Sequence, residues 1–280
     1  MAHEYVVCDV FTDRPLTGNQ LAVFSDATAI PDELLQPLAR ELNFSETTFV
    51  YPPDDAAAAD ARIRIFTPAL ELPFAGHPTL GTAVVLGKQR GNLAAIRLQT
   101  GRGVVPLTLE GDSGRMVQPV PTVEAVDDAE VAVLTTALGI GAPVVPVDRY
   151  DNGVRHTYLV VDGVETVLGL RPDLATIAEA AGAGGTNVVA GRDSRWTSRM
   201  FAPGAGVNED PATGSAAGPL AVHLARTGLV PWGAEIEIHQ GEVMGRPSVL
   251  RAVASGSDDG IERVEVGGDV VIVGQGSFSV

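Results

Sequence analysis

The stretch Arg-Ile-Phe-Thr-Pro at residues 64–68 decides the fold, because a close copy of it returns at residues 199–203 as Arg-Met-Phe-Ala-Pro. In each half a glycine then leads into a helix-like segment: Gly76-His77-Pro78 precedes residues 79–86, and Gly214-Ser215 precedes residues 216–225. Two blocks with the same order predict two similar lobes from an internal duplication, since a solenoid needs three or more copies. The alternative is chance, because apolar strands followed by glycine-started helices are common.

Hydrophobic periodicity predicts the elements around these blocks. Leucines recur at helical spacing between Pro31, which is suited to a helix start, and Asn43. Valine-rich or alternating runs predict strands at 5–11, 47–51, 62–67, 157–161, 186–190 and 198–201, and residues 21–24 form a further short apolar run. The predicted helices are 31–43, 79–86, 173–181 and 216–225.

These elements predict an α+β fold with three parts. The expected N-terminal lobe spans residues 1–120 and the C-terminal lobe residues 121–265. Residues 266–280 are expected to form a C-terminal strand that packs back on the N-terminal lobe.

Composition excludes several classes of partner. The chain has 280 residues with 35 acidic and 19 basic side chains, a formal net charge of −16. This surplus argues against nucleic acid or an anionic membrane as partner, and no apolar run approaches the roughly 18 residues of a membrane span.

Cys8 is the sole cysteine, so no intrachain disulfide forms. The N-terminus lacks a signal-peptide pattern. The expected location is the reducing cytoplasm.

Residues suited to acid–base chemistry lie at predicted element boundaries. Glu46 is placed where a helix gives way to a strand, His77 at a helix N-terminus, and Asp210 and Ser215 around a second one. Helix N-termini present free N–H groups and the positive end of the helix dipole, which makes them anion sites. Two such ends facing one cleft between the lobes would hold a substrate carboxylate near a proton acceptor. The dipole also favours a neutral His77.

Each of these residues also has a simpler explanation. Ser215 is a suitable N-cap, and Asp210 before a proline suits a turn. A single histidine is more often packed than catalytic, and a single glutamate is usually a solvated surface acid. The symmetric placement of His77 and Ser215 favours the functional interpretation.

The common catalytic motifs are missing from the sequence. Residues 214–218 do not form the G-x-S-x-G nucleophile elbow, and no phosphate loop or dinucleotide fingerprint is present. The five histidines are scattered, without H-E-x-x-H or a thiolate cluster. The sequence therefore predicts neither a metal site nor a bound cofactor.

At the three chemical segments the sequence resembles the phenazine-biosynthesis isomerase family, called PhzF-like. The matching stretches are residues 45–47, residues 71–78 with Gly81, and residues 209–217. Residues 152–156 and 240–248 also resemble the branch that serves phenazine synthesis itself. One departure is Gln20, where the family usually has proline, and it leaves the three segments intact.

The resemblance implies the diaminopimelate epimerase fold. In that fold each lobe is a mixed sheet wrapped around a central helix, expected here at 79–86 and 216–225. Epimerases of that fold carry a cysteine at the start of each central helix. His77 and Ser215 stand at these positions in this chain, so a two-thiol racemase is excluded.

The resemblance further implies a cofactor-free isomerase that works as a homodimer. Its substrate would be a small cyclic carboxylic acid, trans-2,3-dihydro-3-hydroxyanthranilate, which it converts to an aminoketone. Glu46 is implied as general acid/base. The other implied site residues are His77 and Asp210, which bind or orient the substrate for catalysis, and the substrate-binding Ser215, Gly76, Gly214 and His156.

Two alternatives remain open at this point. The same chemistry on another substrate of an antibiotic pathway would use the same motifs. A non-catalytic binding protein would have kept the fold and lost catalysis, against which the joint retention of Glu46, His77 and Asp210 argues.

Overall fold

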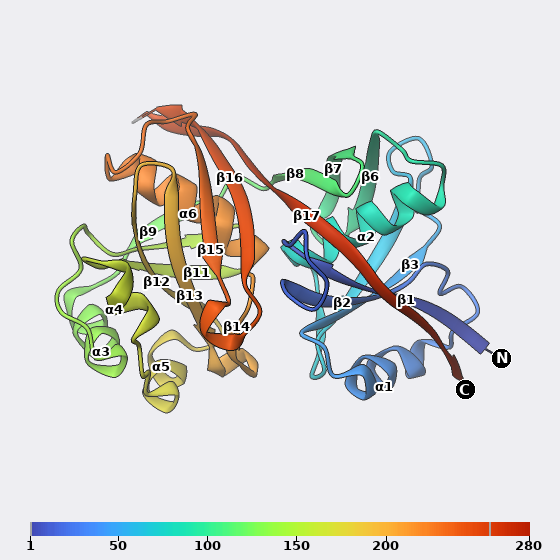
Figure 1. Ribbon diagram of the computed structural model, residues 1–280, viewed down its shortest axis with the longest axis horizontal. Coiled ribbons are helices and arrows are strands. Elements are labelled where there is room, and N and C mark those ends of the chain that lie inside the picture. The colour runs from blue at the N-terminus through green and yellow to red at the C-terminus, as the bar shows by residue number, and fades with distance from the viewer. Residues whose placement is uncertain (1, 258) are drawn as a thin grey trace. The chain divides into compact units, whose positions relative to one another are not determined.

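The computed structural model describes residues 2–257 and 259–280, which belong to two compact units (Figure 1). Unit 1 comprises Met1–Val117 and Gly267–Val280, and unit 2 comprises Gln118–Val266. The last residues of the chain therefore belong to the same unit as the first ones.

Unit 1 is a sheet with two helices. Its elements are β1 (Ala2–Val10), β2 (Asn19–Phe24), α1 (Asp32–Leu42), β3 (Glu46–Tyr51), β4 (Ala61–Phe66), β5 (Glu71–Leu72), α2 (Gly76–Gln89), β6 (Ala95–Thr100), β7 (Gly103–Glu110), β8 (Ser113–Gln118) and the last part of β17 (Gly260–Ser279). β1–β2, β3–β4, β4–β5, β6–β7 and β7–β8 are antiparallel, whereas β2–β3 and β4–β6 are parallel. β17 pairs with both β1 and β8 and closes this sheet.

Unit 2 has more helices on the outside of its sheet. Its elements are β9 (Thr122–Ala125), α3 (Asp128–Leu138), β10 (Asp148–Asp151), β11 (Arg155–Val160), α4 (Val164–Leu168), α5 (Leu174–Ala181), β12 (Gly185–Arg192), β13 (Arg195–Ala202), β14 (Val207–Asp210), α6 (Gly214–Arg226), β15 (Glu235–Gln240), β16 (Ser248–Ser257) and the first part of β17, with short 3-10 turns at Pro203–Ala205 and Glu242–Met244. β10–β11, β12–β13, β13–β14 and β15–β16 are antiparallel, whereas β11–β12 and β13–β15 are parallel.

The two units share one order of strand pairings. From β1 to β7, and again from β10 to β16, the pairings run antiparallel, parallel, antiparallel, antiparallel, parallel, antiparallel. The long helix of each unit, α2 or α6, follows the short strand β5 or β14 in the same place of this order.

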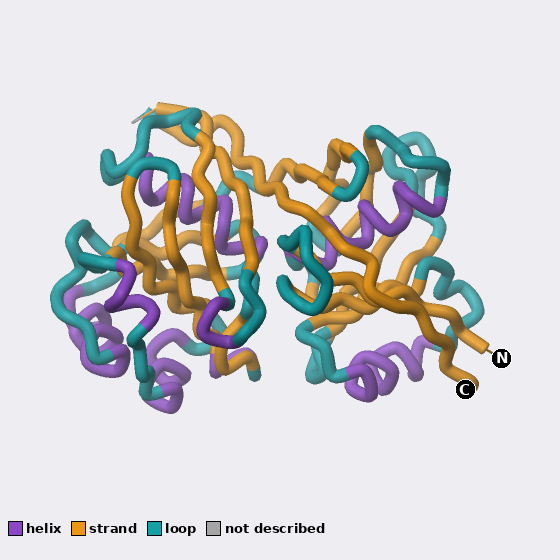
Figure 2. The backbone as a smooth tube through the Cα atoms, viewed as in Figure 1, coloured by secondary structure: helices purple, strands orange, loops and turns teal. Residues whose placement is uncertain are grey.

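Helices α2 and α6 each lie against the sheet of their own unit (Figure 2). Every residue from Gly76 to Gly87 in α2 is buried, and so is every residue from Gly214 to Ala225 in α6. A helix without a polar face is stable only when it is enclosed on all sides. Small residues allow the enclosure: a Cβ on Gly81 would approach the side chain of Leu21 to 2.6 Å.

The outer helices cover the other face of each sheet. In unit 1, α1 buries Leu35 and Leu38 against an aromatic cluster that includes Phe24 and Phe49, whose rings stack at 4.8 Å. In unit 2, α3, α4 and α5 contribute Leu134, Val167, Ile177 and neighbouring apolar residues to a second cluster. Both faces of each sheet are therefore packed.

Most predicted elements are confirmed. The leucine pattern gives α1, and the predicted strands coincide with β1, β3, β4 and β11 to β13 within a few residues, while the apolar run 21–24 lies in β2. The two central helices begin earlier than predicted, at Gly76 and Gly214. The two-residue strand β5 was not among the predicted strands. Helices α3 and α4 and strands β6 to β10 and β14 to β17 were not predicted from the residues, apart from a C-terminal strand.

Candidate active site

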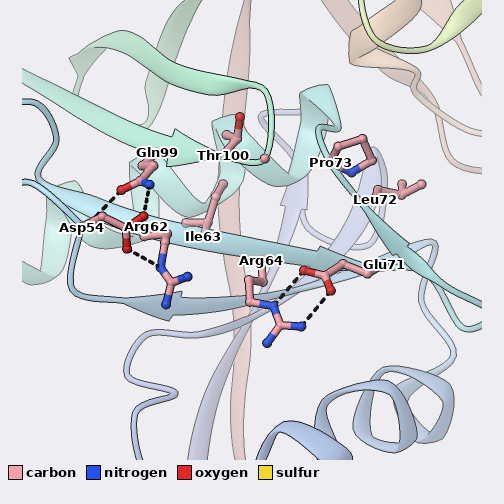
Figure 3. Close-up of a pocket in the computed structure, with 10 residues that line it drawn as sticks. Asp54, Arg62, Ile63, Arg64, Glu71, Leu72, Pro73, Gln99 and Thr100 are labelled. Carbon is pink, nitrogen blue, oxygen red and sulfur yellow. Dashed lines mark hydrogen bonds and ion pairs between the residues drawn. The ribbon is translucent and has the colours of Figure 1, made fainter.

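An arginine–glutamate pair holds the segment that leads into each central helix. In unit 1, Arg64 on β4 donates from Nε and Nη2 to the two carboxylate oxygens of Glu71 on β5, both at 2.7 Å (Figure 3). The guanidinium also lies 5.2 Å from the ring centroid of Phe66. Two parallel hydrogen bonds fix both distance and direction, so the pair anchors the chain shortly before His77.

Unit 2 has the same arrangement in a more buried form. Arg199 on β13 donates from Nε and Nη2 to Glu209 on β14 at 2.7 and 2.8 Å, and lies 5.1 Å from the ring of Phe201. A remaining donor of Arg199 reaches the carbonyl of Leu170 at 3.0 Å. Arg64 and Arg199 are the first residues of the two matching blocks, and Glu71 and Glu209 each lie just before a glycine-started helix.

The first group of predicted residues comes together at the start of α2. Glu46 is the first residue of β3, and its Oε2 lies 3.4 Å from Nε2 of His77, the second residue of α2. Asn19, the first residue of β2, places Nδ2 3.3 Å from Nδ1 of the same ring and accepts a hydrogen bond of 3.1 Å from Ser45 Oγ. Asn19 is fully buried. The imidazole is therefore contacted on both ring nitrogens.

Burial keeps His77 neutral. Desolvation lowers the pKa of His77 to about 3, opposed by a hydrogen bond with the backbone of Gln20. With a neutral ring, Nε2 of His77 and Oε2 of Glu46 are two buried polar atoms 3.4 Å apart, and no hydrogen bond joins them. The Glu46 side chain is 14% exposed, so it lies at the edge of the buried region, while its Oε2 atom is buried.

Cys8 takes no part in this group. It lies in β1 as predicted and is fully buried, and burial raises the pKa of its thiol far above the usual range. A thiol that stays protonated is neither a base nor a nucleophile at neutral pH.

The start of α6 is held by two buried side-chain amides and contains a proline. Pro219 inside α6 has no N–H group, so the carbonyl of Ser215 lacks its usual helical donor. Asn152 supplies it, with Nδ2 at 2.9 Å from that carbonyl, and Gln118 Nε2 donates to the carbonyl of Gly214 at 2.8 Å. Gly218 makes room, because a Cβ there would lie 2.3 Å from Gln118 Oε1. The first turn of α6 is thus fixed from outside the helix.

Asp210 is tied to the residue that precedes α6. Thr213, the N-cap position, donates from Oγ1 to Asp210 Oδ2 at 2.7 Å. Gln240 on β15 donates to both the Asp210 carbonyl, at 2.8 Å, and Thr213 Oγ1, at 2.9 Å. Asp210 is 7% exposed, so its carboxylate lies at the rim of a hydrogen-bonded network.

Ser215 and His156 form a second contact at this helix start. His156 on β11 places Nε2 3.0 Å from Ser215 Oγ. Its ring is 1% exposed, and burial lowers its pKa to about 4. His156 is therefore a neutral neighbour of Ser215 at pH 7.

Both helix starts suit an anion. Among the residues described, neither α2 nor α6 has a side-chain cap or an acidic residue in its first turn. The positive end of each helix is then left to a ligand. Within 2–257 and 259–280, no group of three or more His, Cys, Asp and Glu side chains is arranged to hold a metal ion, and no helix is long and apolar enough to cross a membrane.

A cavity of about 510 Å³ in unit 1 lies elsewhere (Figure 3). Its lining includes Asp54, Arg62, Arg64 and Glu71. Arg64 pairs with Glu71, and Arg62 lies 3.6 Å from Asp54. Because these charges are matched within the cavity, it presents no excess charge to a ligand.

The predicted residues thus lie in two sets. Glu46, His77 and Gly76 belong to unit 1, whereas Asp210, Gly214, Ser215 and His156 belong to unit 2. Sequence reasoning missed the amides that position them. The missed residues are Asn19, Gln118, Asn152 and Gln240. Pro219 was a usable signal, because a proline within a helix predicts an outside donor.

Comparison with known proteins identifies relatives along the whole chain. A trans-2,3-dihydro-3-hydroxyanthranilate isomerase of Pseudomonas fluorescens is 45% identical over 285 residues, covering 99% of each chain. An isomerase of the same name from Pseudomonas aeruginosa is 44% identical, with 98% of each chain covered.

Solved structures share the fold. A Bacillus anthracis phenazine biosynthesis protein of the PhzF family has a TM-score of 0.88 at 21% identity and covers 100% of both chains. A hydroxyproline epimerase from Agrobacterium vitis has a TM-score of 0.65 at 14% identity, covering 99% of this chain and 91% of the other. At these identities the likeness establishes a mixed α and β fold common to PhzF proteins and such epimerases.

The family model described as "Phenazine biosynthesis-like protein" matches residues 8–276. The motifs around Glu46, His77 and Asp210 lie within that range. The chain therefore belongs to the phenazine biosynthesis-like (PhzC–PhzF) family, as the sequence motifs predicted.

Proposed function

We propose that this protein is a cofactor-free isomerase that moves a proton and a double bond on trans-2,3-dihydro-3-hydroxyanthranilate, with Glu46 as general acid/base. The substrate is supported by the names of relatives that are 44–45% identical over nearly the full chain. The chemistry is supported by the contact between Glu46 and His77, which is the observation that carries the proposal.

The contact suits a proton shuttle. Glu46 takes the proton from C3 of the substrate, and the electrons of that C–H bond form the new double bond. The same carboxylic acid then returns the proton at C1, and the resulting enol tautomerises to the aminoketone. His77, held neutral by burial, takes or gives a hydrogen bond at Oε2 without placing a positive charge beside the carboxylate. General acid–base catalysis of this kind requires a carboxyl group shielded from bulk water.

Unit 2 supplies binding groups in this proposal. Asp210 accepts a hydrogen bond from the substrate amine, and the Ser215 hydroxyl donates to the carboxylate. The N–H groups of Gly76 and Gly214, each the first residue of a central helix, add donors for anionic oxygens.

We also propose that the two units arose by internal duplication, as in the diaminopimelate epimerase fold. The shared pairing order and the equivalent pairs Arg64–Glu71 and Arg199–Glu209 support this origin. Family resemblance supports a homodimer, which light scattering of the purified protein tests. The presence of a single cysteine, Cys8, supports a cytoplasmic location, which cell fractionation tests.

The experiment is incubation of the purified protein with trans-2,3-dihydro-3-hydroxyanthranilate while its ultraviolet absorbance is followed. Turnover by the wild type and none by a Glu46→Gln variant is the expected result. Running the reaction in heavy water tests the shuttle, because a shielded Glu46 returns part of the original hydrogen to the new C–H bond. Complete deuterium incorporation from the first turnover would assign the proton return to a second group, Asp210 or His77.

Two other outcomes would contradict the proposal and favour an alternative. Binding without turnover, measured by calorimetry, would indicate a binding protein. Neither binding nor turnover would indicate a different substrate.

A further inference from the structure

We propose that His156 is a positioning residue that donates a hydrogen bond to Ser215 and thereby leaves the Ser215 hydroxyl hydrogen for the substrate carboxylate. This inference rests on the proposed function and deepens it, because it gives Ser215 a single hydrogen-bonding direction. The observation that carries it is the 3.0 Å separation of His156 Nε2 and Ser215 Oγ.

His156 is too buried to contact a ligand that approaches from solvent. Its side chain is 1% exposed, whereas that of Ser215 is 7% exposed. Gly185 on the adjacent strand β12 packs against the ring, since a Cβ there would lie 2.5 Å from His156 Nδ1. Glycine at this position lets the ring approach the backbone and turn its Nε2 toward α6.

The two ring nitrogens have unequal surroundings. Nε2 faces the serine hydroxyl, while Nδ1 is buried and has no hydrogen-bond partner among the residues described. A neutral imidazole carries one N–H, and burial keeps this ring neutral. An orphaned N–H donor in a protein interior is rare and costly. The proton therefore resides on Nε2, where it has an acceptor.

The tautomer of His156 determines in which direction the Ser215 hydroxyl donates its hydrogen bond. Oγ accepts from His156, so its own hydrogen is directed elsewhere and becomes a donor to an anionic oxygen. The opposite tautomer, with Ser215 donating to Nε2, is the one that activates a serine nucleophile, and it needs a third group on Nδ1–H. Asp151 acts on His156 only through its charge and makes no hydrogen bond to Nδ1 among the described residues. The pair therefore binds an anion and does not perform acyl transfer.

The first test reads the tautomer directly. Protein labelled with ¹⁵N in histidine is examined by NMR at pH 7, with a His156→Gln variant to assign the signals. A pyrrole-type Nε2 and a pyridine-type Nδ1 are expected. A proton on Nδ1 would overturn the inference, and because this readout needs no turnover, failure of the isomerase proposal does not affect it.

The second test measures binding in a Glu46→Gln background, where the substrate is bound but not converted. His156→Leu is expected to raise the Kd for trans-2,3-dihydro-3-hydroxyanthranilate about tenfold, the scale of one hydrogen bond to a charged group. His156→Gln, which keeps an N–H donor, is expected to restore most of this loss. His239→Gln on β15 is the matched control and leaves the Kd unchanged.

A double-mutant cycle distinguishes an effect of His156 on the Ser215 hydroxyl from a general disturbance of the binding site. When Ser215→Ala is already present, His156→Leu has no hydroxyl to position and adds less than about a twofold change in Kd. Equal tenfold losses with and without Ser215 would overturn the inference, as would a Gln variant no better than Leu.

Discussion

Glu46 and His77 meet at 3.4 Å although one begins a strand and the other begins a helix. The strand β3 and the helix α2 are both inside unit 1, and Asn19 contacts the far side of the imidazole. The ring is thus held between an amide and a carboxyl group. The acid–base function that we propose for Glu46 depends on this contact.

Glu46→Gln is expected to reduce turnover by about 10³-fold, because glutamine keeps the shape of the side chain and loses the proton-accepting oxygen. The unfolding midpoint in denaturant should stay close to that of the wild type. Glu41→Gln, an exposed glutamate on α1, serves as the control and should retain activity. Near-normal turnover of the Glu46 variant would disprove the acid/base assignment.

Asn19→Ala removes the amide beside His77 Nδ1 and is expected to lower kcat between about 10- and 100-fold, through loss of one buried hydrogen-bonding partner and its orienting effect. Ser45→Ala removes only the hydroxyl that bonds to Asn19, so its loss should be smaller. The graded series is measured by steady-state kinetics. A larger effect at Ser45 than at Asn19 would show that the amide does not orient the ring.

The two arginine–glutamate pairs are expected to differ in stability. Glu209→Gln leaves Arg199, which is 6% exposed, without its counter-charge and should cost about 3–5 kcal/mol of unfolding free energy. Glu71→Gln should cost about 1 kcal/mol or less, because Arg64 is more exposed and keeps a hydrogen bond to Asp32. Urea denaturation measures both. Similar losses in the two variants would contradict the dependence on burial.

Acid pH is expected to destabilise the fold through buried histidines. Burial lowers the pKa of His223, whose Nδ1 lies 3.2 Å from the Tyr150 hydroxyl, to about 4. The unfolded chain takes up this proton near pH 6.5, before the folded protein does. The stabilisation is therefore complete above pH 6.5 and is lost as the pH falls toward 4.

A His223→Gln variant tests this pH dependence. Its loss of unfolding free energy between pH 7 and pH 5 should be smaller than that of the wild type by about 2 kcal/mol. Denaturant titrations at the two pH values give the unfolding free energy of each protein. Because the comparison uses only the change between pH 7 and pH 5, any loss of stability that the substitution causes at both pH values cancels. An unchanged difference would exclude His223 as a source of acid sensitivity.

Dialysis against a chelator is expected to leave turnover unchanged, and added metal, nicotinamide, flavin or pyridoxal phosphate should not raise it. The reason is that the proposed proton transfer uses only Glu46 and its neighbours. Activity that disappears on dialysis and returns with a metal ion would contradict this expectation.

The sequence predicted the elements whose pattern is local. The spacing of leucines gave α1, and the repeated block gave β4 and β13. Strand β7 was missed although its signal was present, since Val105, Leu107 and Leu109 are buried and alternate with exposed residues. The starts of α2 and α6 were placed late because the N-cap of α2 is Ala75, and Thr213 at the N-cap of α6 makes no capping hydrogen bond with its side chain.

Residues with direct chemical signatures could be selected from the sequence as candidates, whereas the residues that hold them in place could not. Glu46 and His77 were selected as titratable groups at boundaries, and the structure brings them into contact. Asn152 and Gln118 do not titrate, and their partners are carbonyls in a distant helix. Such pairing depends on the tertiary fold, which no local sequence pattern specifies.

Strand β17 has a consequence for synthesis on the ribosome. Residues 270–279 pair with β1, so the strand that completes the sheet of unit 1 is translated after the other strands of that unit. Unit 2, Gln118–Val266, is translated in full before that strand. The nascent chain therefore carries β1 with one open edge until residues 270–279 emerge, and such edges recruit other strands. Emergence of β17, rather than emergence of the first 117 residues, is the event that completes the N-terminal unit.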